Sequence, residues 1–160
     1  MRNLLVFVGI LFLAACGNIV DSSGLEDFDN SSLKQELKEK PFQPQLPTKT
    51  PFKVSDTQVI HLPNQDTVLM IDFMSYRDNE RIKNTMGLMV VNGKNVESSN
   101  MEFEDVKIGD IKGKYAVNSA DAMILKWTKD GISYDLTYFG KQSEKEITKA
   151  DLIKTAESFE

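Results

Sequence analysis

Residues 122–139, AMILKWTKDGISYDLTYF, carry the clearest structural signal in the sequence. Asp130 and Gly131 form a dipeptide that supplies the two positive-φ residues of a type I′ turn. After this turn, apolar residues alternate with polar ones from Ile132 to Tyr138, which is the period of a strand with one buried face. The stretch therefore predicts a β-hairpin, and with it a fold built on an antiparallel sheet.

Strand-like segments precede the hairpin along much of the chain. Residues 67–75 (TVLMIDFMS) are apolar on both faces apart from Asp72, which is typical of a central strand. Asn92 and Gly93 form a second hairpin signal. The predicted strands before residue 122 cover residues 52–62, 67–75, 82–91, 96–107 and 111–117. The side chains expected to point inward from two of these strands are Ile82, Met86, Leu88 and Val90, and then Met101 and Phe103.

A short helix is predicted before the first strand. Ser32 can cap this helix with Gln35 as its capping-box partner, and Leu33 and Leu37 share one face. Pro41 ends the helix because proline cannot continue it.

Four of the five prolines of the chain then fall within residues 41–51 (PFQPQLPTKTP). Proline fixes φ and lacks an N–H donor, so this segment is expected to be extended and outside the centre of the sheet. One interpretation is a strap whose Phe42, Leu46 and Phe52 are held in the core. The other is a PxxP ligand for an aromatic groove.

The C-terminal residues predict a second helix. Thr148 caps it with Asp151 three residues on, and its apolar stripe consists of Leu152, Ile153, Ala156 and Phe159. The sequence thus predicts an α+β fold: an antiparallel, curved sheet of six to seven strands, with a short N-terminal helix and a C-terminal helix packed on it.

The N-terminal residues resemble a bacterial lipoprotein signal peptide. Residues 4–13 form an apolar run of about ten residues, too short for the roughly 20 residues that span a bilayer. The small residues Ala14 and Ala15 precede Cys16, the only cysteine of the chain. We expect cleavage between Ala15 and Cys16 and attachment of acyl chains such as palmitate at Cys16. The alternatives are an ordinary signal peptide with a chance cysteine, or an N-terminal membrane helix.

This interpretation divides the chain into three parts: a signal peptide (1–15), a lipidated cysteine with a flexible tether (16–31), and a β-rich domain (32–160). Its localisation is then extracytoplasmic, lipid-anchored to the cell membrane. The processed chain would carry 18 basic and 24 acidic residues, a net charge of −6 with His61 neutral, because only Arg2 lies in the signal. Such a charge argues against nucleic-acid binding and against electrostatic docking on anionic lipid.

Two segments near the C-terminus are similar to the end of the DUF4367 family. Residues 125–136 (LKWTKDGISYDL) and 151–158 (DLIKTAES) resemble its tryptophan strand, "DG" turn, tyrosine strand and closing helix. Residues 109–115 (GDIKGKY) and the pair Leu46-Pro47 resemble earlier parts of the family, so the resemblance covers about residues 33–160. It implies an exported or membrane-anchored protein of a Gram-positive bacterium, with a fold related to the LolA/RseB-like half-barrel. It carries no catalytic residues.

The sequence contains few residues suited to chemistry. His61 is the only histidine, and a zinc site needs three or four ligands, so we expect no metal and no cofactor. No nucleophile or phosphate-binding motif is present, which predicts that the protein is not an enzyme. Asp72 is the most unusual carboxylate, because an unpaired buried charge is costly. Either strand alternation turns it to solvent, or a lysine or arginine of a neighbouring strand pairs with it.

Two functions follow from these observations. The first is a membrane-anchored surface lipoprotein with a non-enzymatic domain that binds a protein partner or senses the envelope. The alternative is a carrier that holds an apolar ligand, such as an acyl chain, in a groove of the sheet. The candidate groove residues are Met70, Met86, Phe103, Tyr115, Trp127 and Tyr134, although aromatic residues on paired strands are more often core packing.

Overall fold

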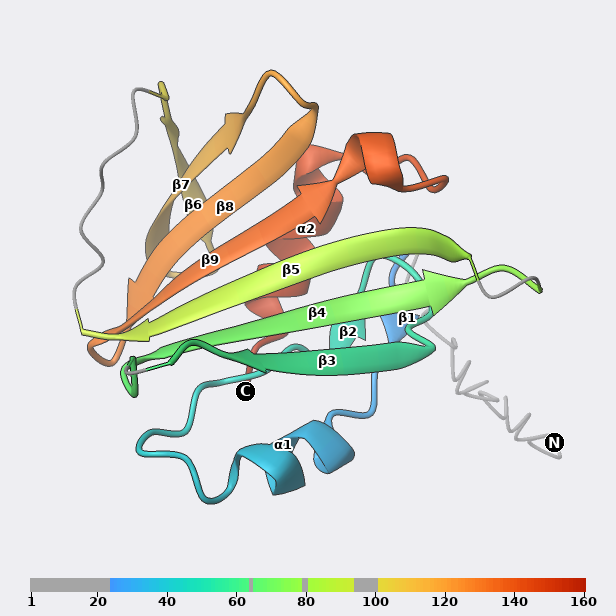
Figure 1. Ribbon diagram of the computed structural model, residues 1–160. Coiled ribbons are helices and arrows are strands. Elements are labelled where there is room, and N and C mark those ends of the chain that lie inside the picture. Colours follow the sequence, from blue (N-terminus) through green and yellow to red (C-terminus); the bar gives the residue numbers. More distant parts are fainter. Residues whose placement is uncertain (1–23, 64, 79–80, 94–100) are drawn as a thin grey trace, which may run out of the picture.

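The computed structural model describes residues 24–63, 65–78, 81–93 and 101–160 (Figure 1). These residues form a seven-stranded antiparallel sheet in the order β3-β4-β5-β9-β8-β7-β6, and a two-stranded sheet, β1-β2. The strands are β1 (Glu26–Asp27), β2 (Lys49–Thr50), β3 (Asp56–His61), β4 (Val68–Tyr76), β5 (Ile82–Asn92), β6 (Glu104–Ile108), β7 (Ile111–Val117), β8 (Ala122–Lys129) and β9 (Ile132–Phe139). The helices are α1 (Ser31–Leu37), the short 3₁₀ helix η1 (Gly140–Gln142) and α2 (Lys149–Glu157). The predicted α+β fold, with helices before and after an antiparallel sheet, is confirmed.

The predicted hairpin, β8–β9, occupies the middle of the large sheet. Its turn residues Asp130 and Gly131 have φ values of 52° and 79°, as a type I′ turn requires. The pairing is continuous from Lys129 opposite Ile132 to Ala122 opposite Phe139. The local signal in the sequence was therefore sufficient to identify this hairpin.

The hairpin predicted at Asn92 and Gly93 is wrong. Strand β5 pairs with β4 on one side and with β9 on the other, and the next strand, β6, lies at the far edge of the sheet. Asn92 is opposite Ile132, and the Gly93 N–H donates to the Gly131 carbonyl at 3.0 Å, so β9 already occupies the edge that a hairpin partner would need. The first part of the predicted strand 96–107 lies outside the described residues.

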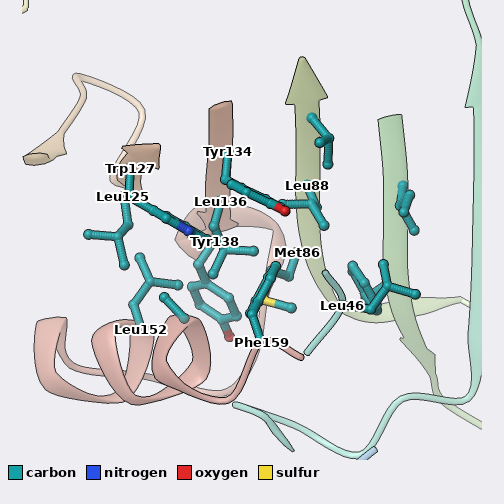
Figure 2. Packing of buried hydrophobic residues seen from close by; sticks show 14 of the residues in the cluster. Leu46, Met86, Leu88, Leu125, Trp127, Tyr134, Leu136, Tyr138, Leu152 and Phe159 are labelled. Carbon is teal, nitrogen blue, oxygen red and sulfur yellow. The ribbon is translucent and has the colours of Figure 1, made fainter. Parts of the chain in front are cut away.

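One face of the large sheet, called here the inner face, carries the hydrophobic core. Helix α1, residues 41–52 (the strap) and α2 contribute buried side chains to it, and α2 lies against β6 and β8 (Figures 1 and 2). The sheet contributes alternate residues of its central strands, and these are buried: Leu69, Ile71 and Phe73; Met86, Leu88 and Val90; Leu125 and Trp127; Tyr134, Leu136 and Tyr138. Leu46 and Phe52 of the strap are also buried and Phe42 packs against the core, which confirms the strap.

The C-terminal helix is held at both of its ends. At its start, the predicted capping box is present: the Thr148 N–H donates to Asp151 Oδ2 at 2.8 Å, and the Asp151 N–H donates to Thr148 Oγ1 at 3.2 Å. After its end, Leu46 and Glu160 exchange two backbone hydrogen bonds of 3.1 Å. The chain terminus is thereby paired with the strap, and Phe159 is directed into the core.

The start of the folded unit differs from the prediction in two ways. Ser32 lies inside α1 and is not its cap; the N-cap residue is Asn30, whose amide donates instead to the Pro47 carbonyl at 3.0 Å. The predicted flexible tether also ends earlier than residue 31, because β1 pairs with β2 and the Phe28 ring packs edge-on against Phe73, 5.5 Å between centroids. Leu33 and Leu37 are buried as predicted.

Residues 1–23 lie outside the described part of the chain, and the predicted signal segment with Ala15 and Cys16 is among them. Within the part that is described, no helix combines the length and the apolar character needed to cross a membrane.

Replacing Leu152 with alanine should destabilise the domain strongly. Leu152 is fully buried between α2 and the sheet, and removing such a side chain costs about 2–5 kcal/mol of unfolding free energy. Urea denaturation followed by circular dichroism measures this loss. Lys154→Ala, on the exposed side of the same helix, is the control and should change stability by less than about 0.5 kcal/mol. Equal effects of the two variants would show that α2 is not part of the core.

Candidate functional site

The inner face of the sheet is filled by side chains of the same chain. The Trp127 and Tyr134 rings stack at 5.0 Å with an interplanar angle of 5°. The Phe159 ring stands edge-on to both, at 5.1 Å from Trp127 and 5.9 Å from Tyr134 (Figure 2). The hydroxyl of Tyr134 is also used, because it accepts a hydrogen bond from the Gln45 N–H at 3.1 Å. An apolar ligand would have to displace these contacts.

The six predicted groove residues do not line one groove. Met86, Tyr115, Trp127 and Tyr134 are buried on the inner face. Met70 lies on the opposite face, because its strand neighbours Leu69 and Ile71 point inward and side chains alternate along a strand. Phe103 precedes β6, and its ring lies 5.3 Å from the ammonium of Lys126, which also belongs to the opposite face. The structure therefore brings four of the six residues to one face and places Met70 and Phe103 away from them.

The opposite face, called here the outer face, can be followed strand by strand from the register of the sheet. Residues that are paired across antiparallel strands point to the same side. One continuous row runs from β3 to β6 across all seven strands: Ile60, Met70, Met89, Asp135, Lys126, Lys114 and Asp105. Its first three members are apolar and half-buried, and its last four are charged.

The charged half of this row is internally neutralised. Lys126 Nζ lies 3.0 Å from Asp135 Oδ2, and both side chains are largely shielded from solvent. Lys114 Nζ lies 3.9 Å from Asp105 Oδ1 in a more exposed pair. The apolar half of the row comprises Ile60, Met70 and Met89 and is called here the apolar strip. No element in the part of the chain that the structure describes lies over it.

Asp72 lies beside the apolar strip, in the next row of the outer face. It is paired in register with Gln58 on one side and Gly87 on the other. A Cβ atom at Gly87 would lie 3.4 Å from Asp72 Oδ1 and 3.2 Å from the Phe139 ring, so the carboxylate and the ring converge over the glycine. Asp72 is half-buried and no cation of the described residues pairs with it. Burial raises the pKa of this carboxyl above its ordinary value.

Both sequence-based alternatives for Asp72 are thereby decided. Strand alternation turns it to the outer face, as the first alternative requires, but the neighbouring side chains keep it partly desolvated. No lysine or arginine of the described residues compensates the charge, so the second alternative is wrong. A partly buried carboxylate without a counter-ion is costly, and its presence needs a reason outside the stability of the domain.

A hollow of about 580 Å³ borders the charged half of the outer face. Lys112, Lys114 and Lys126 line it, and two of these three lysines are already in ion pairs. Three hydroxyl-bearing residues line it, Thr128, Ser133 and Tyr134, and the first two contact each other through their hydroxyls at 3.4 Å. The Ser133 hydroxyl also donates to the Gly93 carbonyl at 2.8 Å.

The remaining candidates also stand apart from any chemical site. His61 is exposed at the end of β3, and its imidazole makes no hydrogen bond or ion pair with the residues described here. No group of three or more His, Cys, Asp or Glu side chains suited to a metal occurs in the described part of the chain. Cys16 and Ala15 lie outside it. The outer face, with its apolar strip and Asp72, is the candidate functional surface. The sequence did not predict the apolar strip, because a strand that is apolar on both faces does not show which residues point to which side.

The position of Asp72 predicts a pH-dependent stability. The pKa of Asp72 is higher in the folded state than in the unfolded chain, so the folded state binds this proton more tightly. Protonated Asp72 therefore favours folding at a pH below its unfolded-state pKa. This contribution to the free energy of unfolding is lost as the pH rises through the folded-state pKa. Asp72→Asn should therefore be more stable than the wild type at pH 7, by roughly 0.5 kcal/mol after screening by solvent. The difference should shrink as the pH falls toward about 4.

Denaturation midpoints measured between these two pH values test the prediction for Asp72. The matched control is Asp66→Asn, which removes the same charge from an exposed turn and should leave the midpoint almost unchanged. A wild-type protein as stable as Asp72→Asn at every pH would show that Asp72 is fully solvated.

Comparison with known proteins gives one match. Residues 50–158 match the family described as "Domain of unknown function (DUF4367)", which is more than half of the chain. The matched residues include all seven strands of the large sheet and α2, but α1 and most of the strap precede them. No curated protein and no solved structure matches the chain.

Proposed function

The chain belongs to the DUF4367 family, and from this premise we propose that it is a membrane-anchored surface lipoprotein whose domain binds a protein partner, or senses the envelope through such a partner, without catalysis. The observation that carries the proposal is the asymmetry of the sheet. Its inner face is filled by α2, Phe159 and the strap, whereas the apolar strip of the outer face has no described element over it.

The outer face has the composition of a protein-binding surface. Such surfaces have an apolar centre surrounded by polar residues. Here the apolar strip is flanked by Gln58 and Asp72 on one side and by the Lys126–Asp135 ion pair on β8 and β9. A lysine or arginine of a partner, placed against Asp72, would compensate a charge that the domain itself leaves without a counter-ion. The destabilising carboxylate would then be retained for binding.

The lipid anchor rests on the sequence around Cys16. The apolar run of residues 4–13 and the small residues Ala14 and Ala15 precede the cysteine with the spacing of lipoprotein precursors. Diacylglycerol on the sulfur and a further acyl chain on the freed amine would give stable membrane binding, because each buried CH₂ contributes about 0.8 kcal/mol and one chain alone is marginal. The relation to LolA/RseB-like half-barrels is part of this proposal; a curved antiparallel sheet with a helix on one face supports it.

The carrier of an apolar ligand is the less supported function. It would need an open groove on the inner face, where Trp127, Tyr134 and Phe159 are in contact with one another. Met70 and Phe103 would contribute nothing to such a groove, because they lie at the other face of the sheet.

Replacing Cys16 with serine should release the protein from the membrane. The hydroxyl of serine does not form the thioether, and Cys16 precedes every described element of the fold, so the domain should stay folded. Partitioning between detergent and aqueous phases measures the anchor, and circular dichroism of the aqueous fraction confirms folding. If the mutant and the wild type partition alike, the lipoprotein proposal is wrong.

A photo-crosslinking side chain in place of Met70 should give a discrete protein adduct in the native cell envelope. Met70 is half-buried at the centre of the apolar strip, so a bound partner must come within reach of it. The same side chain in place of Lys154, on the exposed side of α2, is the matched control and should give no adduct.

Two results would contradict the choice of the outer face. One is equal labelling from both positions. The other is lipid recovered by organic-solvent extraction of purified Cys16→Ser protein, which carries no anchor; that lipid would favour the carrier.

A further inference from the structure

Three large hydrophobic side chains are strongly exposed among the described residues. They are Tyr76, Ile82 and Val117, with 36%, 51% and 50% of their surfaces accessible. Each lies at a strand terminus: Tyr76 ends β4, Ile82 begins β5 and Val117 ends β7. The prediction that Ile82 points into the core is wrong, because the register shifts between Ser75 and Tyr76 and leaves Ile82 beyond the edge of the core.

These three residues lie at the same end of the sheet. Tyr76 and Ile82 are direct partners across β4 and β5. The row that starts at Val117 continues through Met123, Tyr138 and Met86 to Phe73, so it meets β4 three residues before Tyr76 and β5 four residues after Ile82. With about 4.8 Å between neighbouring strands and about 3.3 Å between residues along a strand, Val117 lies roughly 20 Å across the sheet from Tyr76 and is set back from it by about 10 Å along the strands.

The described chain also begins at this end. The Gly24 carbonyl accepts a hydrogen bond from Lys145 Nζ at 3.0 Å, and the Lys145 N–H donates to Asn84, two residues from Ile82. Glu26 and Tyr76 line the same hollow of about 590 Å³. Figure 1 shows β1 beside the C-terminal end of β4.

The position of Gly24 limits how the domain can be placed at a membrane. Eight Cα-to-Cα steps connect Cys16 to Gly24, and such a segment spans at most about 29 Å in any conformation. Strand β5 alone has 11 residues, or about 36 Å. The end with Gly24 is therefore the one that a lipid on Cys16 keeps nearest to the bilayer. Among the described residues, no strongly exposed large hydrophobic side chain lies at the opposite end of the sheet.

The side chains at this end suit the interface between water and lipid. Tyrosine is enriched at that level of membranes because its ring is apolar and its hydroxyl is polar. Arg77 is neutralised within the domain by Glu144 and Lys141 by Asp121, while Lys53, Lys83 and Lys145 line the hollow beside Tyr76. Because the net charge of the chain disfavours anionic surfaces, we assign the attraction to apolar contact.

We propose that this end of the sheet is a membrane-contact surface, at which Tyr76, Ile82 and Val117 enter the phospholipid head-group region when Cys16 is acylated. The inference rests on the proposed lipid anchor and adds an orientation to it. The strands then run away from the membrane, and the outer face stands to the side, where a partner can reach it.

A fluorescent label at position 82 tests this orientation. The full acylated chain with Ile82→Cys has a single free thiol, since Cys16 carries the lipid. After labelling with a polarity-sensitive dye and reconstitution into phosphatidylcholine vesicles, we expect emission at shorter wavelength and quenching by a head-group nitroxide. Quenching should be several-fold stronger than for Gln65→Cys, an exposed position in the turn between β3 and β4 at the other end. Val117→Cys should behave like Ile82→Cys and provides a second site.

The outcomes separate the contact from the anchor. If the chain does not float with the vesicles, the lipoprotein proposal fails. If it floats but labels at 82 and 65 are quenched equally, the anchor stands and the contact surface is wrong. Vesicles with added phosphatidylglycerol should give the same quenching; a signal that requires the anionic lipid would overturn the apolar contact.

Discussion

The edge of the Phe159 ring against the stacked rings of Trp127 and Tyr134 is the contact on which the rest of the structure depends. Helix α2 has nine residues, and a helix of that length is marginal in water on its own. It is held by its buried stripe, by this aromatic cluster, and by the two hydrogen bonds between Glu160 and Leu46. Because the strap and the C-terminal residues meet at this point, the same contact closes the inner face and joins the strap to the end of α2.

Closure of the inner face determines where function can lie. A curved antiparallel sheet with a helix on one side has two surfaces, and here one of them is occupied by the chain itself. The other surface divides between paired charges on β9 to β6 and the apolar strip on β3 to β5. Asp72 lies on that second part with its pKa raised by burial, so a surface that costs the domain stability has been kept. This cost separates the outer face from an ordinary solvated side of a sheet.

What the sequence predicted depended on how local the determining interactions are. The β8–β9 turn and the capping box of α2 are decided by residues within a few positions of one another, and both were predicted correctly. The place of β6 at the far edge depends on β9 pairing with β5, a contact between residues 40 to 52 positions apart that periodicity cannot show. Met70 was assigned to a groove because β4 is apolar on both faces, which hides the side to which each residue points. Asp72 was recognised as unusual, but its lack of a counter-ion is a property of the assembled sheet.

The proposed anchor and the shape of the domain together explain why the exposed apolar side chains are so few and so placed. In this proposal, a lipid on Cys16 would supply most of the membrane affinity, since its chains would bury many CH₂ groups. Additional apolar contact with the membrane would then serve to orient the domain and would not be needed for membrane binding. Three side chains along one end are suited to that task, because a line of contacts resists tilting in one direction while burying little area. A larger apolar patch at this end would bind lipid before acylation, and one on the outer face would compete with a partner for the apolar strip.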